Sequence, residues 1–167
     1  MTILRGITGF HNAKDKELPS IDISAFRSHC QAAALTLQGH ITCIASAPTP
    51  TANFYKALIS FSDRTIAILI NRYYPTIAFA NPEPDHNNQY CIIDVDSLSA
   101  CLKGLAKYDL LSATEAKRGL TEDDLKNLTN SEQKQILYWK PITVGSLVFR
   151  LIRLKRTWFD EWQRSLA

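Results

Sequence analysis

The sequence is poor in the residues and runs that mark unusual proteins. Its 167 residues include six glycines and seven prolines, too few for a collagenous or low-complexity chain, and its 46% content of hydrophobic residues is too high for intrinsic disorder. No apolar run approaches the roughly 20 residues that a membrane-spanning helix requires. The first residues also lack the basic and apolar regions of a secretory signal. We therefore expect a single cytoplasmic domain over residues 1–167, without a membrane span.

Cysteine and histidine are scarce and are not arranged for metal binding. The four cysteines include no Cys-x-x-Cys pair, and the four histidines include no closely spaced pair that would complete a zinc site. We expect no structural metal and four reduced, mostly buried thiols, at Cys30, Cys43, Cys91 and Cys101.

Motifs of the common enzymes and cofactor-binding sites are also missing. The chain has no Gly-x-Ser-x-Gly, no Gly-x-Gly-x-x-Gly, no phosphate-binding loop and no His-Glu-x-x-His. Asp94 and Asp96 could form a pair of carboxylates on one face of a strand, an arrangement that serves general acid–base or metal chemistry. Alternatively, Asp96 ends the strand and caps the next helix, which is the commoner situation. We therefore expect no enzyme activity, no metal and no cofactor.

Charge is distributed unevenly along the chain. Residues 1–149 hold 14 basic and 14 acidic side chains, whereas residues 150–167 hold five basic and two acidic ones, so the net charge of +3 belongs to the C-terminal end. Apolar residues recur there at intervals of three or four: Leu147, Leu151, Leu154, Trp158, Trp162 and Leu166. This spacing predicts an amphipathic helix over 146–166. The basic part of this helix, 149–167, could pack on its own domain, on a partner or on a membrane surface.

The rest of the chain predicts an α+β fold. Asp22 or Ser24 can cap a helix over 25–38, and Gly39 can end it. Stretches rich in Ile, Thr and aromatic residues predict strands at 40–46, 53–62, 65–72, 75–81 and 89–95. Turn residues between them indicate an antiparallel meander. Both faces of residues 65–70 are apolar, so this strand should be covered on both sides.

Capping patterns predict further helices after the strands. One helix is expected at 97–107, and Thr121 with Asp124 forms a variant of the capping box at the start of another. Ser131 is the expected cap of a helix over 132–138. The predicted architecture is an antiparallel β-meander of about five strands, packed with an N-terminal helix and several C-terminal helices.

Two stretches of the sequence carry a resemblance to a known family. They are Arg-Gly-Ile-Thr-Gly-Phe-His at 5–11 and Tyr-Trp-Lys-Pro-Ile-Thr-Val-Gly-Ser-Leu-Val-Phe at 138–149. Both are similar to segments of small bacterial immunity proteins, which are encoded beside polymorphic toxins of contact-dependent growth inhibition systems. Such relatives usually have an acidic residue and then Asn, Trp and Asp near Ser146 and residues 150–153, where this chain has a basic stretch.

The resemblance implies a cytoplasmic protein that binds the C-terminal domain of a cognate toxin, often a nuclease, and blocks its active site or substrate face. Such a protein needs a complementary surface and no chemistry of its own. Because nucleases tend to be basic, a matching inhibitor would present acids. The acidic candidates for partner binding are Glu83, Asp85, Asp94 and Asp96 around a proline-containing loop at 81–88, and Glu122, Asp123 and Asp124 at the predicted helix cap. Each could instead be a solvated loop residue or a cap.

A second hypothesis is that the chain binds single-stranded nucleic acid. Aromatic residues of the predicted strands could stack on bases beside the basic C-terminal helix: Phe54, Tyr55, Phe61, Tyr73, Tyr74 and Phe79. The strands carry little excess basic charge, and alternating aromatics more often form a core. Nucleic acid is therefore the less favoured partner.

Overall fold

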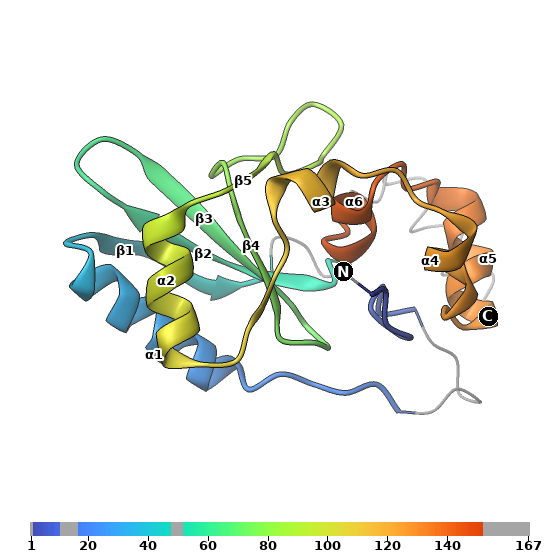
Figure 1. The fold of residues 1–167 in the computed structure, drawn as a ribbon, viewed down its shortest axis with the longest axis horizontal. Helices are drawn as coiled ribbons and strands as arrows, with labels where there is room; N and C mark the ends of the chain where they lie inside the picture. Colours follow the sequence, from blue (N-terminus) through green and yellow to red (C-terminus); the bar gives the residue numbers. More distant parts are fainter. Residues whose placement is uncertain (1, 11–16, 48–51, 152–167) are drawn as a thin grey trace, which may run out of the picture.

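A computed structural model describes residues 2–10, 17–47 and 52–151 of the chain. Its centre is a six-stranded sheet with helices on both faces (Figure 1). The strands are β1 (His40–Ser46), β2 (Phe54–Ser60), β3 (Thr65–Asn71), β4 (Thr76–Ala80), β5 (Ile92–Ile93) and β6 (Asp109–Leu110). The helices are α1 (Ile23–Thr36), α2 (Asp96–Leu105), α3 (Ala113–Lys117), α4 (Glu122–Lys126), α5 (Asn130–Trp139) and α6 (Val144–Val148). The predicted α+β fold is confirmed, and none of the helices described is long and apolar enough to cross a membrane.

Strands β1 to β5 lie in the sheet in their sequence order, each antiparallel to the next. β2 and β3 pair without interruption from Phe54 opposite Asn71 to Ser60 opposite Thr65, which confirms the predicted meander. β5 is shorter than the strand predicted at 89–95 because the preceding loop continues through Cys91. The sequence gives no sign of β6, which pairs parallel with the start of β4.

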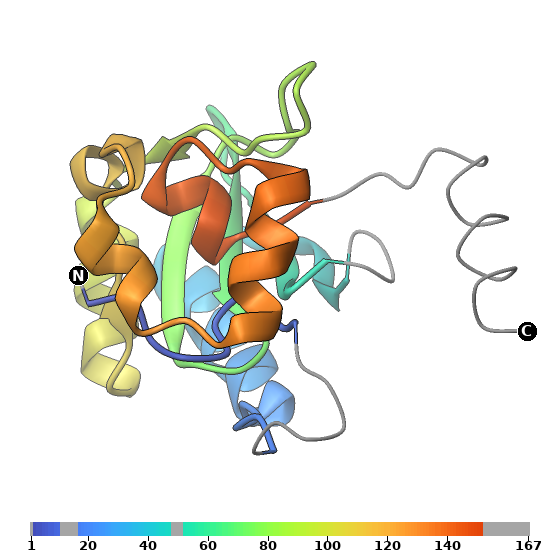
Figure 2. The same ribbon diagram turned by 90° about the vertical axis from the view of Figure 1, so that its right-hand side faces the viewer.

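β3 is buried on both faces, as its sequence predicts. Ile66, Ile68 and Ile70 belong to a core shared with α1 and α2, whose buried residues include Phe26, Cys30, Leu98 and Leu102. Ala67 and Leu69 belong to a second core, shared with α6 and the N-terminal segment (residues 2–10) through Ile3, Ile7, Val144, Leu147 and Val148. Figure 2 shows the red α6 and orange α5 beside the blue N-terminal segment. One sheet therefore separates two hydrophobic cores.

α1 begins and ends close to its predicted positions. Asp22 is the N-cap, and its carboxylate accepts hydrogen bonds from two backbone N–H groups of the first turn at 2.9 and 3.0 Å. At the other end Gln38, with φ of 56°, adopts the left-handed conformation usually taken by glycine. Gly39 is needed for a different reason, because a Cβ there would lie 2.8 Å from side-chain atoms of Ile59 and Phe61.

Capping boxes start the last three helices described, α4, α5 and α6. Thr121 and Asp124 form the predicted box at α4. The prediction that Ser131 caps the next helix is wrong, since α5 begins earlier, with Thr129 as its N-cap and Glu132 completing the box. The position three residues after Ser131 is a lysine, which cannot accept a hydrogen bond from the N-cap backbone.

The helix predicted over 146–166 is interrupted within the described chain. α6 ends at Val148, and Phe149 and Arg150 are not helical. Phe149 packs edge-to-face on Phe54 with 5.9 Å between ring centroids, and the Arg150 N–H donates to Oδ1 of Asn53 at 2.7 Å. These contacts draw the chain towards β2 instead of continuing the helix. Residues 152–167, most of the predicted basic C-terminal helix, lie outside the described residues.

A buried carboxylate fixes the N-terminal segment to α5. Glu132 is fully buried and accepts hydrogen bonds from the Gly6 N–H at 2.9 Å, the Thr8 hydroxyl at 2.7 Å and the Thr8 N–H at 3.2 Å. It also accepts the Thr129 N–H at 2.9 Å in the capping box. Gly6 has φ of 83°, a left-handed conformation that favours glycine, so the segment can turn towards the carboxylate.

Two buried asparagines join the same segment to the sheet and to α6. Nδ2 of Asn53 and Nδ2 of Asn71 each donate to the carbonyl oxygens of Ile7 and Val148, at distances between 2.8 and 3.1 Å. Both asparagines are at most 1% exposed. The Val148 carbonyl at the end of α6 and the Ile7 carbonyl of the N-terminal segment therefore accept hydrogen bonds from the same two side chains.

Replacing Glu132 with alanine should lower the free energy of unfolding by about 3 kcal/mol or more, because the buried N–H groups of Gly6, Thr8 and Thr129 lose their acceptor. Glu132→Gln keeps one acceptor oxygen and should fall between this variant and the wild type. Denaturant unfolding followed by circular dichroism measures the change. The exposed Lys134→Ala in the same helix is the control and should stay within about 0.5 kcal/mol of wild type. A Glu132→Ala protein of wild-type stability would contradict this role.

Candidate functional site

Two of the predicted partner-binding acids lie on a loop at 81–91, here called the acidic loop. It projects from the sheet in both views (Figures 1 and 2). Asp85 organises it, because its Oδ1 accepts hydrogen bonds from the N–H groups of Asn87 at 2.8 Å and Gln89 at 2.9 Å. The Asp85 N–H also donates to the Gln89 carbonyl at 2.8 Å. Glu83 has 77% of its side chain exposed, and its carboxylate lies 4.0 Å from the Lys56 ammonium. Glu83 and Asp85 therefore both face solvent, on a loop whose backbone is held by internal hydrogen bonds.

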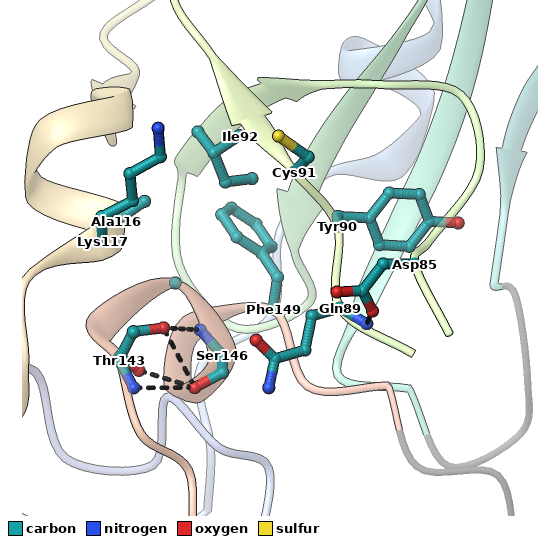
Figure 3. A pocket seen from close by; sticks show the side chains of 11 residues that line it. Asp85, Gln89, Tyr90, Cys91, Ile92, Ala116, Lys117, Thr143, Ser146 and Phe149 are labelled. Carbon is teal, nitrogen blue, oxygen red and sulfur yellow. Dashed lines mark hydrogen bonds between the residues drawn. The ribbon is translucent and has the colours of Figure 1, made fainter. Parts of the chain in front are cut away.

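A groove of about 220 Å³ lies beside the acidic loop, against α3 and α6 (Figure 3). Its walls carry one carboxylate and one ammonium group, from Asp85 and Lys117, among uncharged residues. The other lining residues are Gln89, Tyr90, Cys91, Ile92, Ala116, Thr143, Gly145, Ser146 and Phe149. This mixture suits contact with another molecule's side chains.

Ser146 in this groove has no histidine to activate it as a nucleophile. The Ser146 hydroxyl donates to the Thr143 carbonyl at 2.8 Å, and no histidine lines the groove. Among the residues that the structure describes, no cluster of three or more His, Cys, Asp or Glu side chains could hold a metal ion. Of the four cysteines only Cys30 is fully buried, so the prediction of mostly buried thiols is wrong. Burial raises the pKa of Cys30 to about 12, and Cys91 is exposed.

Asp94 and Asp96 do not form the carboxylate pair that a strand would have produced, because β5 ends at Ile93. The Asp94 carboxylate accepts the Ala113 N–H at 2.9 Å and so connects the end of β5 to the start of α3. Asp96 is the first residue of α2, whose N-cap is Val95, so it lies in the first turn without being the cap. Both are exposed and remain candidates for partner contact.

Asp124 differs from the other predicted acids because its carboxylate is already bound within the chain. Arg118 donates to it from two nitrogens at 2.7 and 2.9 Å, and Thr121 donates from its N–H and its hydroxyl, both at 2.8 Å. These hydrogen bonds, those from Arg118 above all, hold the pKa of Asp124 well below its ordinary value of 3.8. We therefore leave Asp124 out of the candidate partner surface, while Glu122 and Asp123 are exposed beside it.

Asp124→Asn should lower the free energy of unfolding at pH 7 by about 1 kcal/mol, a modest value because Arg118 is partly solvated. The folded-state pKa lies below the unfolded one, so this stability is present above about pH 4 and is lost as the pH falls. Urea unfolding at pH values from about 7 to 2 should show the two proteins converging in acid. Asp123→Asn, an exposed neighbour, should leave the profile unchanged. A difference from wild type that persists undiminished to the lowest pH would contradict the assignment.

The structure also assembles a cluster that sequence reasoning missed: Phe10, Trp139 and Arg150. The Cζ of Arg150 lies 3.9 Å from the Phe10 ring centroid and 5.8 Å from that of Trp139, and the two rings meet edge-to-face at 6.3 Å. The predicted helix places Arg150 in water, whereas it is only 7% exposed. The one sequence signal is its position directly after the apolar run that ends at Phe149.

The aromatic residues considered for nucleic-acid stacking are divided between the two faces of the sheet. Phe54 is buried in the core with α6, and Phe79 is buried in the core with α1 and α2. Of the remaining four, Tyr74 packs against the first of these cores and Tyr55 and Phe61 against the second, whereas Tyr73 belongs to neither. These residues therefore do not form one stacking surface.

The two stretches that resemble immunity proteins lie together in space. Ile7 from the first and Val148 from the second share the amide donors of Asn53 and Asn71. Phe10 from the first packs on Trp139 from the second. Ile7 of the first stretch and Val144, Leu147, Val148 and Phe149 of the second belong to the second core, whereas Tyr138 and Ile142 are exposed.

Comparison of the chain with models of known protein families, with curated proteins and with solved structures gives no match.

Proposed function

We propose that this protein is an immunity protein, which binds the C-terminal domain of a cognate toxin of a contact-dependent growth inhibition system and covers its active site or substrate face. The observation that carries the proposal is the acidic loop, with the exposed carboxylates of Glu83 and Asp85 on a backbone fixed by hydrogen bonds. The resemblance of residues 5–11 and 138–149 to immunity proteins supports it.

The internal hydrogen bonds of the acidic loop favour binding. A loop that is already ordered loses little conformational entropy when a partner docks, so more of the contact energy appears as affinity. The groove beside it could receive a side chain of the partner while Glu83 and Asp85 contact basic groups. This arrangement serves inhibition by coverage, which requires no reaction.

Electrostatic complementarity should act locally. The chain as a whole has a net charge of +3, so it cannot attract a basic nuclease through its total charge. Glu83 and Asp85 form a local acidic surface on the loop. Two further exposed acids, Asp94 and Asp96, come directly after β5, the strand that follows this loop in the chain. Glu122 and Asp123 form a separate exposed pair on α4. We place the centre of the interface on the acidic loop, and shape must supply the remaining specificity.

The proposed partner also fixes the compartment. A nuclease toxin acts on nucleic acid inside the recipient cell, so its inhibitor has to be present in the cytoplasm. The toxin domain should be encoded next to the gene for this protein, and the domain encoded directly upstream is the first to test.

Charge reversal on the acidic loop should weaken toxin binding. In the variant Glu83→Lys with Asp85→Asn, the asparagine retains an oxygen that can accept the loop hydrogen bonds. We expect the association rate for the purified toxin domain to fall about tenfold, with a weaker salt dependence, because steering by the acids is lost. Surface plasmon resonance at several salt concentrations measures both quantities.

The matched control is Glu122→Lys with Asp123→Asn, which makes the same charge change on exposed residues of α4. It should bind with nearly the wild-type rate. Absence of any complex with the wild-type protein would contradict the proposed function. Equal association rates for the wild type and both variants would instead place the interface on another face.

A further inference from the structure

Arg150 carries a positive charge that the described part of the chain does not neutralise. Its side chain is 7% exposed, and its Nε is enclosed without a hydrogen-bond acceptor. No ion pair within residues 2–10, 17–47 and 52–151 involves this guanidinium. A desolvated charge is strongly unfavourable unless an opposite charge and hydrogen bonds compensate it. The site therefore has an unmet requirement for an anion.

The surroundings of Arg150 hold the cation without supplying an acceptor. The Phe10 and Trp139 rings stabilise it through their π faces, Phe10 more closely, at 3.9 Å. Burial lowers its pKa to about 10, Tyr73 opposes this effect and Arg72 adds to it, so the group stays charged at neutral pH. Phe10 and Trp139 thus make an aromatic wall around a charged guanidinium.

The backbone of Arg150 is held in place. Its N–H donates to Oδ1 of Asn53 at 2.7 Å, and its carbonyl accepts the Asn53 N–H at 3.4 Å. Asn53 is itself buried and bonded to Ile7 and Val148. An anion that meets this guanidinium would find it already positioned, which reduces the entropy lost on binding.

We infer that Arg150 is an anchor for an acidic side chain of the protein partner, whose Asp or Glu carboxylate accepts hydrogen bonds from the guanidinium at the edge of the Phe10–Trp139 wall. This inference rests on the proposed function and adds a second element to it. The partner then needs a basic area for the acidic loop and one carboxylate for Arg150. Buried arginines beside aromatic residues are typical of the residues that dominate protein interfaces.

A protein is favoured over a nucleic acid by exposed apolar side chains that are close to Trp139 in the sequence. Leu137, Tyr138 and Ile142 come from the same stretch as Trp139 and are 72–74% exposed. Exposed apolar side chains of this size suit the apolar centre of a protein interface.

The carboxylate site can be tested without the toxin. Full-length protein labelled with ¹⁵N-arginine is titrated with sodium acetate against sodium chloride at constant ionic strength, and the Nε–H signals are followed by NMR. The signal missing from Arg150→Lys identifies Arg150. We expect that signal to shift saturably with acetate and to a much smaller extent with chloride. An Arg150 signal that does not shift with acetate would overturn the inference. This outcome includes the case in which a carboxylate of this chain is already bound to the guanidinium.

The toxin domain tests whether the partner uses the site. Arg150→Gln should weaken binding at least about tenfold, and Arg150→Lys should weaken it less, because lysine keeps the charge and loses the planar fork. Arg64→Gln, which removes an exposed arginine beside Asp63, is the control and should bind as wild type. Undiminished toxin binding by Arg150→Gln would overturn the partner assignment. Weakened toxin binding by this variant, combined with no acetate response in the wild type, would also overturn it, because the arginine would then act only through packing. If wild type binds acetate but no toxin domain, the proposed function and the partner assignment fail and the carboxylate site remains.

Thermal unfolding separates an anchor from a structural residue. Arg150→Met removes an unpaired buried charge and keeps apolar contact with the rings, so the midpoint should rise above that of the wild type. Arg64→Met, at an exposed position, should leave it unchanged. A fall in the midpoint of Arg150→Met would show that the arginine stabilises the fold and would overturn its assignment as an anchor.

Discussion

The hydrogen bonds of the Glu132 carboxylate are the constraint on which the second core depends. Within the described residues no basic side chain bonds this buried carboxylate, and N–H and hydroxyl groups of Gly6, Thr8 and Thr129 satisfy it. Such an arrangement is favourable only when all donors are in place together, because a partly satisfied buried charge is strongly destabilising. The N-terminal segment therefore takes one position relative to α5. This position in turn delivers the Ile7 carbonyl to the two asparagines that join the sheet to α6.

Local patterns allowed the first half of the fold to be predicted from the sequence, and long-range hydrogen bonds explain where prediction failed. The apolar faces of residues 65–70, the cap at Asp22 and the box of Thr121 with Asp124 depend on neighbours in the sequence, and the structure confirms them. The interruption after Val148 depends on Asn53, nearly one hundred positions away, which no periodicity reveals. Helical spacing in the C-terminal stretch therefore overstated the helix.

The candidate site shows the same division. The sequence identified the exposed acids of the loop, because prolines and turn residues mark such loops. It could not distinguish Asp124 from Glu122 and Asp123, since only the fold brings Arg118 onto one of these three carboxylates. Nor could it place Arg150 beside the rings of Phe10 and Trp139, which both precede it in the sequence. Arg150 was predicted to lie within an amphipathic helix, whereas it follows the end of α6 and is only 7% exposed.

The second core contains the two ends of the described chain, and this has a consequence for synthesis. The sheet and the core with α1 and α2 consist of residues that leave the ribosome before α5 and α6. The N-terminal segment is synthesised before the sheet, yet its partner Glu132 follows the sheet and both helices of the other core. Until α6 is made, the face of β3 that bears Leu69 lacks the cover of Val144, Leu147 and Val148. Between the synthesis of β3 and that of α6, the nascent chain therefore has an incompletely covered apolar sheet face, and avoidance of aggregation depends on how quickly residues 2–10 meet α5 and α6.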